Sequence, residues 1–198
     1  MNKLKIGITG GIGTGKTTVA KIIEANGFTV LNADDTARKL MQTDKEIRRK
    51  LIEKFGSEVF IDNKLNSKFI SNIVFNDKNK LKLLNSIVHP ATIKNISEEI
   101  TERQKTENLI FVESALVFEA KMEELFDHVL LVTADDDKRI ERIKIRNNYS
   151  DSEILKIIEN QIPENIKKSK SDFIIINNGN LEDLKTKTEF FLRLFNSL

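Results

Sequence analysis

Short apolar runs and longer amphipathic stretches alternate along the chain. The apolar run from Leu4 to Thr9 has the length of a buried strand, and glycines follow it. Thr17 to Ala25 carries apolar residues at helical spacing, and Phe28 to Leu31 has the pattern of a second strand. A strand, a helix and a strand in such close succession predict a βαβ unit, in which the two strands are parallel.

The middle of the chain has a different pattern. From Asp34 to about Thr106 the residues are highly charged, and their apolar positions recur at helical spacing. We expect several helices there and find no clear signal for a strand. The elements predicted after this segment come from β-branched apolar runs and from amphipathic stretches. The strands are Leu109 to Val112, Val129 to Thr133 and Phe173 to Ile176, and the helices are Asp135 to Asn147, Asp151 to Gln161 and Leu181 to Phe195.

A glycine-rich segment lies between the first strand and the first helix. Gly10 to Thr17 reads GGIGTGKT, which matches the P-loop pattern G-x-x-x-x-G-K-[ST] at every fixed position. Glycines let the backbone amides of such a loop turn toward phosphate oxygens. Lys16 is then placed to bridge the β- and γ-phosphates, and the Thr17 hydroxyl is a ligand for Mg²⁺. The residues predicted to bind the nucleotide are Gly11, Gly13, Thr14, Gly15, Lys16, Thr17 and Thr18.

The motif and the order of the elements together predict the fold. We expect an α/β P-loop NTPase of the nucleotide-kinase type, with a five-stranded parallel sheet and helices on both faces. A chain of 198 residues fits one domain. Within it we expect a nucleotide-binding core of about residues 1–34, 106–138 and 166–198. A helical insert of about residues 35–105 would bind the acceptor, and residues of about 139–165 would form a lid.

Other interpretations of the glycine segment fit less well. A plain turn does not need four glycines before Lys-Thr, and the dinucleotide pattern G-x-G-x-x-G fails because Lys16 stands at its third glycine. The guanine-reading Asn-Lys-x-Asp of switch GTPases is absent, and Ser114-Ala115-Leu116, which looks like their shorter guanine motif, directly follows the third strand. A small-molecule kinase is favoured, with a regulatory nucleotide-binding module as the alternative from another class.

Two carboxylates follow predicted strands. Glu113 ends the third strand, where a carboxylate would hold Mg²⁺ or its water, although an acid at a strand end is often only a loop residue. Asp34 lies just past the second strand, where an acceptor alcohol would meet the γ-phosphate. It is the candidate general base, and the alternative is that Asp34 or Asp35 caps the next helix.

Three arginines recur at helical spacing after the fourth strand. Arg139, Arg142 and Arg146 are separated by three and four residues, so they share one helix face. We expect them to form a lid over a triphosphate, since guanidinium groups pair well with phosphate. The alternative is an ordinary solvated helix face.

Composition narrows the possible partners. The 32 Lys and Arg residues nearly balance the 30 Asp and Glu residues, and the formal net charge is +2. The basic residues are spread along the chain and form no basic block, so we expect no nucleic-acid partner. The chain has no cysteine, which excludes a disulfide framework and a catalytic thiol. No apolar run approaches the ~18 residues of a membrane span. We expect a cytoplasmic monomer or weak oligomer without membrane contact.

These residues resemble those of the dephospho-coenzyme A kinase family nearly from end to end. Ile6 to Val19 is similar to the family's loop, and Asn32-Ala33-Asp34 followed by Thr36-Ala37-Arg38 resembles its Asp-Ala-Asp and the next helix. His89-Pro90 is similar to a His-Pro that opens a helix in the family's substrate region. Further matches are Glu113 to Glu119, Arg142, Arg146, Gln161, Asp172 and Asn177-Asn178-Gly179.

The resemblance implies a substrate and roles for single residues. It implies that ATP, with Mg²⁺, phosphorylates the 3′-hydroxyl of the ribose of dephospho-coenzyme A in the last step of coenzyme A synthesis. The implied catalytic residues are Asp34, Lys16, Arg142 and Arg146, and those for the acceptor are Asp34, Arg38, His89 and Glu113. Asn178 would contact the adenine side, and Thr17 and Glu113 would hold the metal, Glu113 through water. The chain departs from the family at Asn32 and Glu113, where aspartate is usual, and at Ala115, where proline is usual.

Overall fold

The computed structural model describes residues 3–75, 77–147, 154, 157–159 and 161–198. The chain divides into two compact units. A core unit comprises Met1–Asn32 and Glu99–Leu198, and a helical unit comprises Ala33–Glu98.

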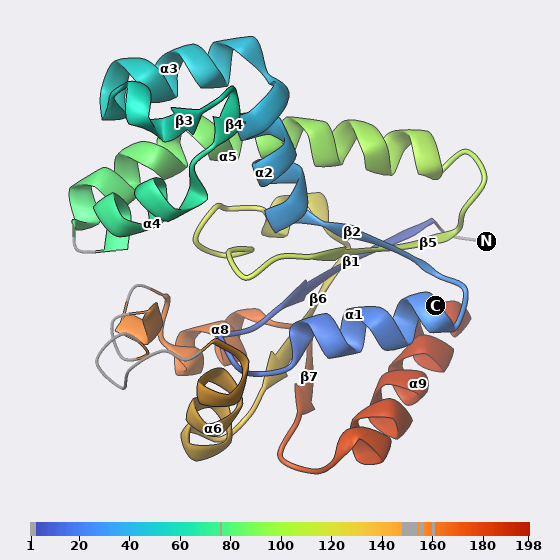
Figure 1. Ribbon diagram of the computed structural model, residues 1–198. Helices are drawn as coiled ribbons and strands as arrows, with labels where there is room; N and C mark the ends of the chain where they lie inside the picture. Colours follow the sequence, from blue (N-terminus) through green and yellow to red (C-terminus); the bar gives the residue numbers. More distant parts are fainter. Residues whose placement is uncertain (1–2, 76, 148–153, 155–156, 160) are drawn as a thin grey trace. The chain divides into compact units, whose positions relative to one another are not determined.

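The core unit is built on one five-stranded sheet, in which all four neighbouring pairs of strands are parallel. The strand order is β2-β5-β1-β6-β7 (Figure 1). The strands are β1 (Leu4–Thr9), β2 (Thr29–Asn32), β5 (Leu109–Glu113), β6 (His128–Thr133) and β7 (Phe173–Ile176). The predicted α/β class with a five-stranded parallel sheet is confirmed.

Both faces of the sheet are covered because its central strands are apolar on both sides. Helices α1 (Lys16–Ala25) and α9 (Leu181–Ser197) pack together, and residues of both join Ile6 and Ile8 of β1 in one apolar cluster. Gly7 points to the opposite face, where an added Cβ would lie 2.4 Å from the ring of Phe126. That face is thus packed so closely that β1 has no room for a side chain at this position.

The carboxyl ends of the five strands meet at one edge of the sheet, since all of the strands run in the same direction. The strand register pairs Asn32 at the end of β2 with Glu113 at the end of β5, and Glu113 with Ile8 of β1. The glycine loop follows β1 at this edge. Residues far apart in the sequence are thereby brought together at the edge where ligands bind in parallel α/β folds.

The helical unit has its own apolar core around Ile47, Leu51, Val59 and Ile70. Its elements are α2 (Ala33–Thr43), α3 (Lys45–Phe55), η1 (Ser57–Val59), β3 (Phe60–Ile61), β4 (Lys64–Leu65), α4 (Ser67–Phe75) and most of α5 (Lys78–Arg103). The hairpin of β3 and β4 was not predicted, because strands of two residues are too short to show alternation. Its turn residues Asp62 and Asn63 both have positive φ, as a type I′ turn requires.

The prediction that His89-Pro90 opens a helix is wrong. Pro90 lies inside α5, which runs without a break from Lys78 to Arg103. A proline inside a helix removes one backbone hydrogen bond, and this helix continues on both sides of Pro90. His89 is therefore a residue of the helix interior.

Two further helices lie at the start and at the end of the segment predicted as a lid. α6 (Asp136–Asn147) was predicted almost to the residue, but α8 (Glu164–Lys170) was not predicted. The one buried residue of α8 is Lys167, so its buried face carries no apolar signal. Much of the predicted helix from Asp151 to Gln161 lies outside the described residues. Ile154 and residues 157–159 are helical, and Gln161 lies at a bend.

Within the described part of the chain, no helix is both long enough and apolar enough to cross a membrane.

The aromatic cluster of the core unit gives a first test of the packing. Phe195 of α9 is 2% exposed and contacts the rings of Phe111, Phe173 and Phe191. We expect Phe195→Ala to lower the free energy of unfolding by about 3–5 kcal/mol, because it leaves a cavity in the core. Phe190→Ala on the same helix is the control, since Phe190 is 56% exposed and should cost less than about 1 kcal/mol. Chemical denaturation measures both, and equal losses would contradict this assignment of the core.

Candidate active site

The glycine loop joins β1 to α1 and turns sharply at two glycines. Gly13 has φ 79° and Gly15 has φ 98°, and both angles fall in the left-handed region that favours glycine. A Cβ on Gly15 would also lie 2.4 Å from Nδ2 of Asn177. Among the described residues, no side chain caps the amino terminus of α1. The loop and the helix end therefore offer backbone N–H groups and a positive helix terminus, which suit a phosphate group.

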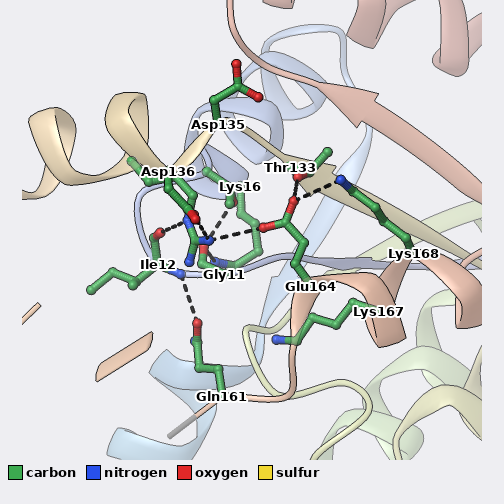
Figure 2. A network of polar contacts seen from close by, with 12 residues as sticks. Gly11, Ile12, Lys16, Thr133, Asp135, Asp136, Gln161, Glu164, Lys167 and Lys168 are labelled. Carbon is green, nitrogen blue, oxygen red and sulfur yellow. Dashed lines mark hydrogen bonds and ion pairs between the residues drawn. The ribbon is translucent and has the colours of Figure 1, made fainter. Parts of the chain in front are cut away.

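Two side chains of the loop bond back to the carbonyl oxygen of Gly11. The Thr14 hydroxyl donates to it at 2.9 Å, and Lys16 Nζ lies 3.4 Å from it. Thr14 is fully buried, and its side chain braces the loop from inside. Figure 2 marks the contact between Lys16 and Gly11 with a dashed line. Thr14 and Lys16, which were both predicted to bind the nucleotide, thus take part in the internal hydrogen bonds of the glycine loop.

Glu113 connects three parts of the carboxyl edge. Its Oε1 accepts a hydrogen bond from the Thr17 hydroxyl at 2.8 Å, and its Oε2 accepts one from Nδ2 of Asn32 at 3.1 Å. Glu113 is 6% exposed. The structure thus brings together Thr17 and Glu113, the two residues predicted at the metal site. The side-chain amide of Asn32, at the end of β2, holds the other oxygen of the carboxylate.

Arg142 reaches the turn after β7. Its Nη2 donates to the backbone oxygen of Asn177 at 3.0 Å, and Nδ2 of Asn177 donates to the backbone oxygen of Thr14 at 2.8 Å. Nη1 of Arg142 is buried and has no hydrogen-bond partner within the described residues. Arg142 is therefore linked to the glycine loop through one residue and retains a donor for a further acceptor.

The asparagine that contacts the loop is Asn177, and Asn178 lies beside it. Asn178 is exposed, and its Oδ1 accepts from the backbone N–H of Asp135 at 2.9 Å. This bond ties the turn after β7 to the start of α6. Sequence reasoning selected Asn178 from the Asn-Asn-Gly turn and missed the loop contact of its neighbour, which only the strand register reveals.

Arg139 contacts the glycine loop directly. Figure 2 labels other residues of the same polar network, among them Ile12, Asp136, Gln161 and Glu164. Its Nε donates to the backbone oxygen of Ile12 at 3.0 Å, and its Nη1 contacts Asp136 at 2.9 Å and Glu164 at 3.1 Å. Gln161 accepts a hydrogen bond from the backbone N–H of Ile12 at 3.1 Å. The Arg139 side chain is 5% exposed, so it does not lie on a solvated helix face. Sequence reasoning missed Glu164, because nothing predicted α8.

Other predicted site residues lie in the helical unit or outside the description. Asp34 and Arg38 are exposed residues of α2, and His89 is half-buried in α5. Asp34 lies in the first turn of α2 and not before the helix, so it does not occupy the capping position considered above. The side chain of Arg146 is outside the described residues. The roles of these four residues stay predictions.

Comparison with known proteins shows the family of the chain. The family profile described as dephospho-CoA kinase matches residues 4–183. The chain is 36% identical to the dephospho-CoA kinase of Fusobacterium nucleatum over 192 residues, which cover 96% of this chain and 98% of that protein. It is 34% identical over 193 residues to the one of Listeria monocytogenes, with 96% of each chain covered. The chain belongs to the dephospho-CoA kinase family.

Solved structures support the same assignment. A dephospho-CoA kinase from Campylobacter jejuni superposes with a TM-score of 0.72 at 26% identity, covering 98% of this chain and 96% of that one. The structure of TT1252 from Thermus thermophilus gives a TM-score of 0.81 at 31% identity, with 98% of each chain covered. A shikimate kinase from Acinetobacter baumannii, at 15% identity and a TM-score of 0.59, shares the fold.

Membership of the dephospho-CoA kinase family confirms several predictions. The chain is a phosphotransferase with dephospho-CoA kinase activity, which completes the biosynthesis of coenzyme A. ATP is its cosubstrate. The resemblance on which the sequence analysis relied is therefore correct for the whole matched length.

Gly15 offers a test of the loop geometry. We expect Gly15→Ala to abolish measurable ATP binding, because the new Cβ would displace Asn177 and strain the backbone at once. Gly27→Ala is a matched control, since Gly27 also has positive φ (87°) but has no heavy atom within 4 Å of an added Cβ. It should lose about 1 kcal/mol of stability and bind ATP normally. Calorimetric titration with ATP would contradict the assignment if Gly15→Ala bound it like the parent chain.

Proposed function

We propose that this chain transfers the γ-phosphoryl group of ATP to the 3′-hydroxyl of the ribose of dephospho-CoA, with the core unit binding ATP and the helical unit binding the acceptor. The observation that carries the proposal is the junction of the P-loop with Glu113 through the Thr17 hydroxyl, in a chain of this family. This hydrogen bond between Thr17 and Glu113 supports a single site, at the carboxyl edge of the sheet, for both the triphosphate and its cation.

The donor set at this junction fits Mg²⁺. Magnesium prefers oxygen ligands and usually takes one or two from the protein, with the rest from phosphates and water. The Thr17 hydroxyl and the Glu113 carboxylate, 2.8 Å apart, are oxygen donors of this kind. Among the residues described, no group of three or more His, Asp and Glu gathers elsewhere as an alternative metal site. When bound, Mg²⁺ would neutralise part of the charge on the β- and γ-phosphates.

We assign the general base to Asp34. Asp34 is exposed and follows Asn32 by two residues, and the Asn32 amide bonds to Glu113. In the proposed step, the Asp34 carboxylate takes the proton of the 3′-hydroxyl, whose oxygen attacks the γ-phosphorus while the bond to the β-phosphate oxygen breaks and ADP leaves. Arg38 and His89 are proposed to bind the acceptor with the other polar residues of the helical unit.

Positive groups of the core unit are proposed to stabilise the charge that spreads during transfer. Lys16 would bridge the β- and γ-phosphates, and Arg142 and Arg146 would act from a lid. The buried Nη1 of Arg142, which lacks a partner within the described residues, supports its role because an incoming phosphate oxygen would satisfy that donor. Asn178 is proposed to contact the adenine side. The lid, the cytoplasmic location and the monomeric or weakly associated state stay predictions.

The acceptor is tested by the release of ADP from Mg-ATP with and without dephospho-CoA. We expect strong stimulation by dephospho-CoA and the formation of coenzyme A, identified by its mass, because the helical unit is proposed to bind this acceptor. A panel of nucleosides, nucleotides and shikimate serves as the control. Stimulation by a member of the panel alone would replace the acceptor, and stimulation by none would favour a nucleotide-dependent regulatory module.

The base is tested by Asp34→Asn. We expect this variant to lose at least about 100-fold in kcat while its affinity for ATP stays within about twofold, since general-base catalysis contributes about 10²–10⁴-fold. Asp35→Asn is the matched control, because Asp35 is also an exposed acid in the first turn of α2. Near-normal turnover by Asp34→Asn would remove Asp34 from this role.

A further inference from the structure

Both backbone groups of Ile12 are held by side chains from distant parts of the chain. The carbonyl oxygen accepts from Nε of Arg139 at 3.0 Å, and the N–H donates to Oε1 of Gln161 at 3.1 Å. These two contacts span 127 and 149 residues of sequence. The orientation of this one peptide in the glycine loop is thus set by α6 and by the segment that precedes α8.

The side chain of Arg139 cannot easily move away from the loop. Its Nη1 lies 2.9 Å from Asp136 and 3.1 Å from Glu164, and only 5% of the side chain is exposed. Glu164 in turn accepts a hydrogen bond from Thr133, the last residue of β6, and pairs with Lys168 at 3.4 Å. The guanidinium group is therefore anchored through Glu164 to the sheet and to α8. Figure 2 shows the contacts of Glu164 with Thr133 and Lys168.

The close approach of Arg139 and Gln161 leaves no room for a side chain at Gly11. An added Cβ would lie 2.5 Å from Nη2 of Arg139 and 3.3 Å from Oε1 of Gln161. Gly11 does not share the positive φ of Gly10, Gly13 and Gly15. Its lack of a side chain is therefore explained by the close approach of Arg139 and Gln161, and not by its backbone angles.

We propose that Arg139 and Gln161 are positioning residues of the kinase reaction, which fix the Ile12 peptide so that the P-loop amides keep the orientation required by the triphosphate. Two carboxylates already neutralise Arg139, so its contribution is to hold the loop and not to add charge near the phosphates. The proposal rests on ATP binding at this loop, but not on the identity of the acceptor.

Gln161→Met tests the proposal with the smallest disturbance. Methionine has a similar length but cannot accept the Ile12 hydrogen bond well. We expect the Kd for Mg-ATP, measured by calorimetry, to rise about fivefold, which corresponds to the loss of about 1 kcal/mol from one hydrogen bond. The KM for ATP should rise in parallel while the KM for dephospho-CoA stays within about twofold.

Gln42→Met is the matched control for this variant. Like Gln161, Gln42 accepts a hydrogen bond from a backbone N–H, that of Leu65 at 2.6 Å, and it also donates to the oxygen of Asn63 at 2.7 Å. Both contacts lie within the helical unit, so this variant should leave the Kd for ATP unchanged. Equal effects of the two variants on ATP would show general destabilisation and overturn the proposal.

Arg139→Gln tests the other contact. We expect a larger rise in the Kd for ATP than in Gln161→Met, because the Ile12 carbonyl and the surface of Gly11 both lose their neighbour. Arg49→Gln is its control, since Arg49 also pairs with two carboxylates, Glu46 and Glu53, but its side chain is 62% exposed on α3. If Arg139→Gln does not fold, Gln161→Met still decides the question.

Two outcomes with Gln161→Met would overturn the proposal. An unchanged Kd for ATP would show that the bond to Ile12 is not needed for nucleotide binding. Tighter binding would show that Gln161 competes with the triphosphate for the Ile12 N–H. A parent chain that binds ATP but is not stimulated by dephospho-CoA would contradict the proposed acceptor alone, since the calorimetric readout needs no acceptor.

Discussion

The site depends on the glycine loop, whose backbone N–H groups converge on the place of a phosphate. Other residues must hold such a loop in its conformation. N–H dipoles that converge repel one another until an anion arrives, so the loop conformation must be held from outside. In this chain the support comes from side chains that bond to loop carbonyls: Thr14 to Gly11, Asn177 to Thr14, and Arg139 to Ile12. Fixing its carbonyls in this way holds the loop in one conformation before a phosphate binds.

The parallel sheet makes this support possible. Residues after β6 and β7 reach the loop after β1 because all three strands end at the same edge. The same geometry places Glu113, at the end of β5, within hydrogen-bond distance of Thr17 on α1 and of Asn32 on β2. Glu113 has a longer side chain than the aspartate that is usual in the family, and the Asn32 amide holds one of its oxygens. A second carboxylate in place of that amide would repel the first, so the two departures from the family pattern are compatible with each other.

The sequence predicted the elements that carry strong local signals. Apolar runs such as Phe173 to Ile176 and the glycine motif are specified by neighbouring residues, so the sheet, its parallel sense and the P-loop followed from pattern alone. The β3–β4 hairpin and α8 did not follow. The strands of the hairpin are two residues long, and the buried face of α8 is a lysine, Lys167, that pairs with Glu119 at 2.9 Å. A buried charge is invisible to an analysis of hydrophobic periodicity, because only its partner makes it stable in the interior.

The same limit applies to the arginines of α6. Helical spacing predicts that Arg139 and Arg142 share a face, but it cannot assign them different roles. What separates them is their partners: Asp136 and Glu164 neutralise Arg139, whereas Arg142 contacts a backbone oxygen and keeps a buried donor that no described residue fills. A guanidinium group that is already paired with carboxylates adds little net attraction for a phosphate, whereas no carboxylate among the described residues offsets the charge of Arg142. The choice of which arginine positions the loop and which meets the triphosphate is therefore made by the carboxylates of α6 and α8, which only the folded chain brings together.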